Sequence, residues 1–233
     1  EGRDIALAEE VLALEAGHAE ASRVLEAQLR AASNWDALSM RLLNRFSVTV
    51  NPQEKRSVLN ALSKIFEDEM ESTESAFLVY QRALEDNPKD AEALEGAVRI
   101  AEKGEHWQEL YNLFLHLIDN LSGMQRATVE LDAATLAAEK LGLYHKAIAH
   151  LEEVLKTKTD DPEAWMLMAH LLSEVERHHD AISAWESAVR HANEANKVVC
   201  LTNGADCANK AHESVSYTHL RAHETPEHRV CPR

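Results

Sequence analysis

The chain has 233 residues, with 24 Lys and Arg against 40 Asp and Glu, which gives a formal net charge of −16. Only 7 Gly and 5 Pro occur, which excludes collagen-like and Pro/Gly-rich disordered chains and is too few turn formers for an all-β sandwich. The negative charge argues against a surface for nucleic acid or anionic membranes. We therefore expect an acidic, helix-rich chain.

Targeting and membrane signals are missing from the sequence. No apolar run approaches the roughly 20 residues that cross a bilayer, and the segment from Glu1 to Asp4 has no signal-peptide character. We therefore expect a cytoplasmic protein without membrane insertion. Because the first residue is not Met, we also expect the chain to be an N-terminally truncated fragment.

The first predicted elements are paired helices near the N-terminus. Apolar spacing predicts a helix over Ile5 to Leu14 that pairs with a helix over Ala19 to Ala32. Trp35 is expected in the turn that follows, and Leu38, Leu42 and Leu43 belong to the next helix.

The middle of the chain predicts two further pairs. One first helix runs from Gln53 to Glu69, and its second helix starts near Ala76 and ends at Asn87-Pro88. The next pair begins near Leu94, turns at Gly104 and Trp107, and continues through a helix that carries Leu110, Phe114 and Leu117. Helix starts are indicated where a capping side chain adjoins a proline that fits the first turn, at Asn51-Pro52, Asn87-Pro88 with Asp90, and Asp161-Pro162.

The last two pairs repeat one pattern at a spacing of 34 residues. Leu131, Ala134 and Ala138 are followed by Ala147 and Leu151, with Gly142 and Tyr144 in the turn between them. The five helix residues of this block have counterparts 34 residues later, which are Trp165, Met168, Leu172, Ala181 and Trp185. Equivalent positions on the five second helices are Leu38, Ala76, Leu110, Ala147 and Ala181, separated by 38, 34, 37 and 34 residues.

This arrangement resembles the tetratricopeptide repeat (TPR) family, whose helix–turn–helix unit has about 34 residues. The resemblance covers residues 20 to 192 and implies an all-α fold, a right-handed superhelical solenoid of about five antiparallel helix pairs. The array is expected over 1–195, with a partial extra helix over 196–210. The longer steps predict loop insertions near Asp68 to Ser75 and Leu121 to Arg126. A helical array of another type is the alternative.

The resemblance also implies that first helices line a concave groove. Counting from Leu94, Leu131 and Trp165, the groove positions contain seven acidic residues against three Lys or Arg and lack the Lys/Asn clamp with which chaperone-binding members hold a carboxylate. We therefore expect a partner segment with Lys or Arg and an apolar anchor near Leu136 and Met166, or else a groove that is merely solvated. The groove positions are Glu92, Glu95, Arg99, Glu102 and Lys103; Val129, Asp132, Leu136, Glu139 and Lys140; and Glu163, Met166, His170, Ser173 and Glu174.

No catalytic constellation is visible, because phosphate-binding loops, nucleophile elbows and metalloprotease helices are missing from the sequence. We expect a non-enzymatic protein–protein interaction scaffold that binds a protein or peptide and uses no cofactor or metal. The alternative is a regulatory or docking segment of a larger enzyme or envelope-assembly protein.

The C-terminal end differs in composition from the array. Three cysteines and several histidines allow a zinc site, but their spacing is a weak signal. Residues 211–233 instead resemble a read-through peptide, so we expect a disordered or non-native tail. The residues in question are Cys200, Cys207, His212, His219, His223, His228 and Cys231.

Overall fold

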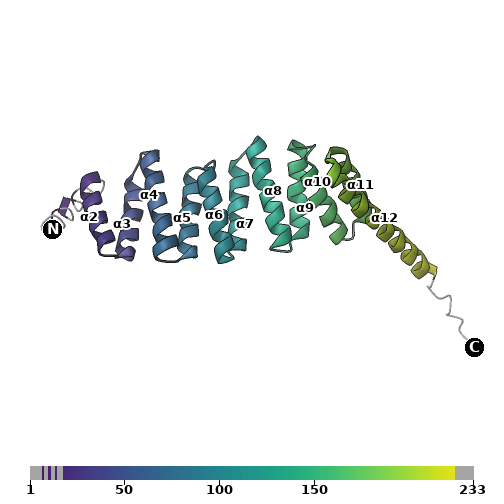
Figure 1. The fold of residues 1–233 in the computed structure, drawn as a ribbon, viewed down its shortest axis with the longest axis horizontal. Coiled ribbons are helices and arrows are strands. Elements are labelled where there is room, and N and C mark those ends of the chain that lie inside the picture. Colours follow the sequence, from purple (N-terminus) through teal and green to yellow (C-terminus); the bar gives the residue numbers. More distant parts are fainter. Residues whose placement is uncertain (1–6, 8–9, 12–13, 15–17, 224–233) are drawn as a thin grey trace, which may run out of the picture. The chain divides into compact units, whose positions relative to one another are not determined.

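The computed structural model describes residues 7, 10–11, 14 and 18–223, and throughout that part of the chain every regular element is helical. This confirms the predicted all-α repeat fold (Figure 1). The helix expected over residues 5–14 falls largely outside the described residues. The chain divides into two compact units, Glu1–Leu113 and Phe114–Arg233.

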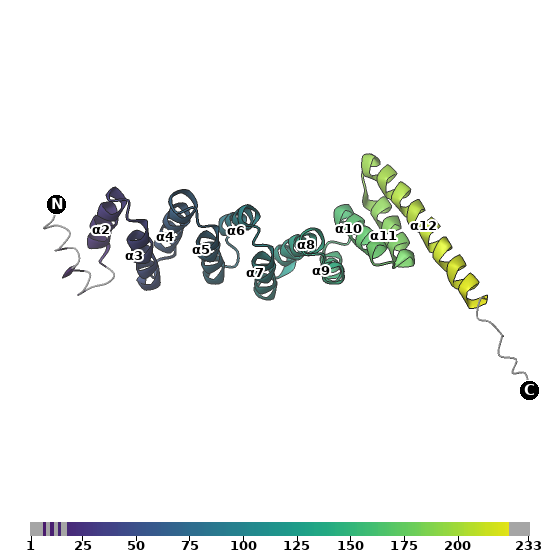
Figure 2. The same ribbon diagram turned by 90° about the horizontal axis from the view of Figure 1, so that it is seen from below.

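Unit 1 consists of consecutive helices, and between residues 19 and 104 each helix packs against the next. Figures 1 and 2 show these helices side by side along this part of the chain. The helix α7 (Trp107–Asn120) crosses the boundary between the units. The other elements of unit 1 are α2 (Ala19–Ala31), α3 (Trp35–Val48), α4 (Pro52–Lys64), the π-helical turn η1 (Ile65–Glu69), α5 (Thr73–Asp86) and α6 (Ala91–Gly104).

Unit 2 contains two helix pairs and a long final helix. The first pair is α8 with α9, the second is α10 with α11, and α12 packs on α11. The bounds are α8 (Gly123–Glu139), α9 (Tyr144–Thr157), α10 (Pro162–Glu174), α11 (His178–His191) and α12 (Glu194–His223).

The expected helix starts are capped as their sequences predict. The Asn51 carboxamide oxygen accepts a hydrogen bond from the Gln53 backbone N–H at 2.9 Å. Asp161 accepts from Glu163 and Ala164 at 3.1 and 3.2 Å, and Asp90 caps α6. These side chains satisfy backbone donors that have no partner inside the helix. Trp35 and Trp107, expected in turns, are instead the first residues of α3 and α7.

The five equivalent positions on the second helices confirm the repeat register. Each side chain is at most 2% exposed. Alanine occupies three of these sites, where its small side chain permits a close helix crossing. The residues are Leu38, Ala76, Leu110, Ala147 and Ala181.

The longer repeat steps were predicted to reflect loop insertions, but part of their extra length is helical. The helix of α4 continues through η1 to Glu69, which leaves a loop of only residues 70–72 before α5. The segment 121–126 is helical from Gly123 onward, which makes α8 a 17-residue helix. Ala127 and Val129 in its early turns are buried, and this burial favours added helix over an exposed insertion.

The final helix α12 includes the partial helix expected over 196–210 and extends to His223. Residues 224–233 lie outside the described residues, so a disordered or non-native tail stays a prediction. Among the helices that the structure describes, none combines the length and the apolar character needed to cross a membrane.

Candidate protein-interaction groove

Unit 1 contains an open groove of about 850 Å³ between its first helices. The groove is lined by side chains of α4, η1, α5 and α6, which include Glu92 and Arg99 from the predicted groove positions. The sequence reasoning did not place the α4 residues that face the same groove. These include Lys55, Arg56, Asn60 and Lys64.

Two ion pairs connect α4 to the α5–α6 segment at one end of the groove. The Lys55 ammonium lies 2.6 Å from an Asp86 carboxylate oxygen, and Arg56 forms an ion pair with Asp90. The hydrogen bond that Arg56 donates to Asp90, together with the negative charge of Asp90, raises the pKa of Arg56. Asp90 thus holds the guanidinium of Arg56 in place while it also caps α6.

A second cluster lies along the same groove, where Arg99 reaches from α6 to η1. Its Nη1 lies 2.5 Å from Glu67 Oε2, and the Tyr80 hydroxyl donates to Glu67 Oε1 at 2.7 Å. Burial opposes ionisation of Glu67, but the hydrogen bonds from Arg99 and Tyr80 outweigh it and lower the pKa of this carboxyl. Burial also raises the pKa of the Tyr80 hydroxyl. The cluster therefore connects three consecutive elements of the groove.

The other predicted groove residues of α6 are exposed. Glu95 and Glu102 present their carboxylates to solvent on the helix that carries Glu92 and Arg99. The acidic character expected from this helix is therefore accessible to a partner.

In unit 2, the predicted groove positions divide into accessible and buried ones. Val129 and Leu136 are 3% and 8% exposed, so little of either side chain is accessible for contact with a partner, and half-buried Met166 offers more apolar surface. Exposed positions are Asp132, Glu139, Lys140, Glu163, His170 and Glu174.

Asp132 differs from the other groove carboxylates. Its side chain has no hydrogen-bond or ion-pair partner among the described residues. Although the residue is exposed, nearby protein atoms partly desolvate its carboxyl group and raise its pKa, and the charge of Lys158 only partly opposes that effect. A partly desolvated carboxylate without an ion-pair partner is stabilised by an additional positive charge nearby.

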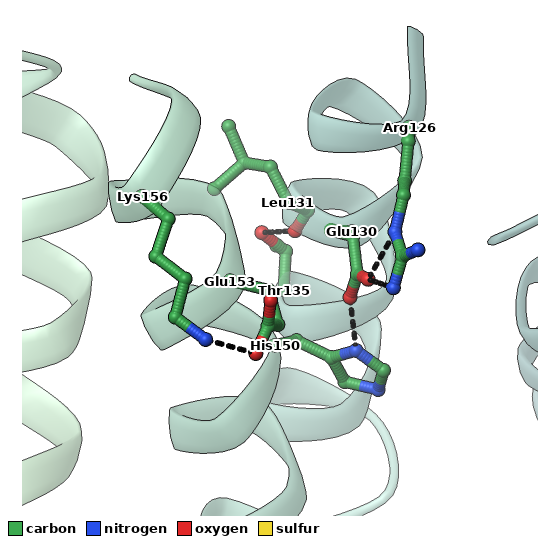
Figure 3. Close-up of polar contacts among 7 residues, drawn as sticks. All are labelled: Arg126, Glu130, Leu131, Thr135, His150, Glu153 and Lys156. Atoms are coloured by element: carbon green, nitrogen blue, oxygen red, sulfur yellow. Dashed lines mark hydrogen bonds and ion pairs between the residues drawn. The ribbon is translucent and has the colours of Figure 1, made fainter. Parts of the chain in front are cut away.

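A buried charge cluster between α8 and α9 was missed at the sequence level. Glu130 is 2% exposed and accepts hydrogen bonds from Arg126 Nε and Nη2, both at 3.3 Å (Figure 3). Its other carboxylate oxygen lies 2.5 Å from His150 Nδ1. The pairing joins the two helices, and the only sequence signal for it was a glutamate among the alanines of a predicted helix.

Metal-binding groups do not converge in the described part of the chain. No group of three or more His, Cys, Asp or Glu residues there could hold an ion. Cys200 and Cys207 are buried in α12, and Cys207 Sγ lies 2.8 Å from Ser173 Oγ. His228 and Cys231, two of the seven residues considered for a zinc site, lie outside the described residues.

Comparisons with known proteins show similarity of fold but find no family model or curated protein that matches the sequence. The chain is similar to a solved structure of Naa15/Naa10 bound to HypK-THB, with 15% identity, a TM-score of 0.54, and coverage of 97% of this chain and 36% of that one. It is also similar to yeast Tom70, with 15% identity, a TM-score of 0.51, and coverage of 95% and 46%.

A third similar structure is YrrB, described as a TPR protein with an unusual peptide-binding site, with 16% identity, a TM-score of 0.49, and coverage of 66% of this chain and 77% of that one. The present chain thus spans less than half of the Tom70 and Naa15/Naa10 chains that it matches. Its antiparallel helix pairs, buried register positions and structural neighbours establish a TPR-like helical repeat fold.

Proposed function

We propose that this chain is a non-enzymatic scaffold that binds a segment of a partner protein along the first helices of its repeats. The observation that supports this most directly is the groove of about 850 Å³ in unit 1. It is open along helices whose exposed side chains carry charges and hydrogen-bonding groups rather than a converging catalytic set. A groove of this size can accept several side chains of a bound segment.

In unit 2, the proposed partner segment has basic and apolar character. Asp132, Glu139 and Glu174 are exposed acidic residues at groove positions. The carboxylate of Asp132, which is exposed but partly desolvated, would gain from the charge of a Lys or Arg side chain. The aliphatic part of such a side chain, or a neighbouring apolar residue, would cover half-buried Met166.

A peptide array tests this proposal. Arrayed 12-residue peptides that combine Lys or Arg with Leu are compared with otherwise identical peptides that carry Asp or Glu, at low and high salt. We expect the basic peptides to bind more tightly at low salt and to lose that advantage at high salt, because added ions screen exposed charges. Equal binding of acidic and basic peptides at both salt concentrations would refute the charge preference.

A matched pair of variants locates the interaction. Asp132→Asn should weaken binding of the basic peptides several-fold, since it removes one charge at a groove position. Glu152→Gln removes the same charge at an exposed position of α9 outside the predicted groove and should leave binding unchanged. Equal losses in both variants would show that net charge, not the groove, controls binding.

A further inference from the structure

The groove of unit 1 has two walls of different charge. The α4 wall presents Arg56, Asn60 and Lys64, which are spaced four residues apart and therefore lie on one stripe of the helix. The α6 wall presents Glu92 and also Arg99, whose guanidinium is paired with Glu67 of η1. Exposed Glu95 lies about one turn beyond Glu92 on the same helix. A cationic stripe is unexpected in a chain with a net charge of −16.

The carboxylates that pair with the two groove arginines, Arg56 of α4 and Arg99 of α6, are recessed, whereas the arginines are exposed. The Arg56 side chain is 51% exposed and its partner Asp90 only 11%. Arg99, which reaches over η1, is 57% exposed and its partner Glu67 13%. Lys64 is exposed and forms no hydrogen bond or ion pair with any residue that the structure describes. A bound segment would therefore meet the positive groups first.

The spacing of the stripe selects one backbone conformation for a bound segment. Arg56 and Lys64 are eight residues apart, or about 12 Å along the helix axis. In an extended chain, side chains on the same edge recur every second residue, so positions i and i+4 are about 13 Å apart. Two acidic side chains at i and i+4 can then face Arg56 and Lys64 together, with the residue at i+2 opposite Asn60.

We infer that this groove binds an extended partner segment whose acidic side chains at i and i+4 face α4 and whose basic side chains at i+1 and i+3 face the carboxylates of α6. The inference rests on the proposed function and adds to it the charge pattern and the extended conformation of the segment in unit 1. Because Asp90 already orients Arg56, less conformational freedom is lost there on binding. Segments with the opposite arrangement would place like charges together and would be rejected.

Fluorescence anisotropy with three labelled peptides tests the pattern. The first, the probe peptide, contains Glu-Lys-Ala-Lys-Glu between flanking Ser and Gly residues. The second contains the same residues, but its two Glu residues and its two Lys residues stand in separate blocks. The third is the probe peptide with both Glu residues replaced by Lys. We expect the first peptide to bind at least about fivefold more tightly than the second, which has the same net charge. Equal binding of the two would overturn the inference.

Variants of the protein assign the effect to the α4 wall. Lys64→Glu should weaken binding of the probe peptide about tenfold, and changing one of the two Glu residues of that peptide to Lys, whichever faces position 64, should restore most of the loss. Lys210→Glu makes the same change of charge at an exposed position of α12 in unit 2 and should have no effect. Equal losses in both variants, or no restoration, would also overturn the inference.

The result separates this inference from the proposed function on which it rests. If the probe peptide fails to bind while basic and apolar peptides bind through Asp132, the inference is wrong and the proposed function stands. If none of the peptides binds, the proposed function fails and the inference fails with it. Far-UV circular dichroism of each variant confirms that the helices are intact.

Discussion

Tyr80 of α5 packs against the backbone of α6 at Gly96. A Cβ added at Gly96 would lie 2.4 Å from Tyr80 Cε1, which is closer than two carbon atoms can approach. The ring cannot simply rotate away, because its hydroxyl is bonded to Glu67 and to Arg99. This contact therefore links helix packing in unit 1 to the polar cluster of the groove.

Gly96→Ala tests that linkage. Alanine favours a helix over glycine by about 1 kcal/mol, but the clash with a fixed ring should cost about 1–3 kcal/mol, so we expect net destabilisation in urea unfolding. Glu95→Ala, an exposed substitution on the same helix, is the control and should change stability little. A more stable Gly96→Ala protein would show that Tyr80 can move freely.

The buried carboxylate of Glu130 predicts a large effect of truncation. Glu130→Ala would leave the His150 and Arg126 side chains without the acceptor that joins α8 and α9. Loss of a buried hydrogen-bond acceptor costs about 1–3 kcal/mol, and because the Arg126 side chain is 45% exposed, no buried positive charge is left behind to raise this cost. Urea unfolding provides the measurement.

Glu153→Gln is the control for Glu130→Ala. Glu153 forms a 2.5 Å ion pair with Lys156 in the same region, but its side chain is 47% exposed. Exposed pairs contribute at most about 1 kcal/mol. Comparable losses in the two variants would mean that burial of Glu130 adds nothing to its role.

The lowered pKa of Glu67 predicts acid sensitivity of unit 1. Because the folded protein favours the carboxylate, this group adds stability at pH values above its ordinary pKa of 4.5. That stability is lost as the pH falls through the lower folded pKa. The free energy of unfolding of the wild type, measured in urea, should therefore fall between about pH 5 and pH 3. Glu67→Gln should show a smaller decrease over the same interval. Identical pH profiles would contradict this assignment.

The repeat register could be predicted from sequence because the same small or apolar residue types recur wherever helices cross. The α4 wall could not be found in this way. Lys55 is the fourth residue of α4, as Trp165 is the fourth residue of α10, so α4 has no large apolar residue from which groove positions can be counted. In the structure, Lys55 covers Phe46, with its ammonium 5.0 Å from the ring centroid.

The polar contacts between different helices could not be predicted from the sequence either. The partners Glu130 and His150 are 20 residues apart, and Glu67 and Arg99 are 32 apart. Helical periodicity places each residue on a face but does not say which charged residues of two neighbouring faces meet. The longer α8 was missed for a related reason, since residues 121–126 carry no strong apolar period and only packing decides that they are helical.

The close crossings of α9 and α11 provide the last prediction. Ala147 and Ala181 are fully buried at equivalent register positions. Replacement of either by Trp should overpack the crossing and destabilise the protein by about 1–3 kcal/mol, which thermal unfolding measures. Ala149→Trp, at an exposed position of α9, adds the same side chain without entering the core and should leave the melting temperature nearly unchanged. If all three variants had the same melting temperature, the second helices would not pack through these alanines, and the repeat register would need to be revised.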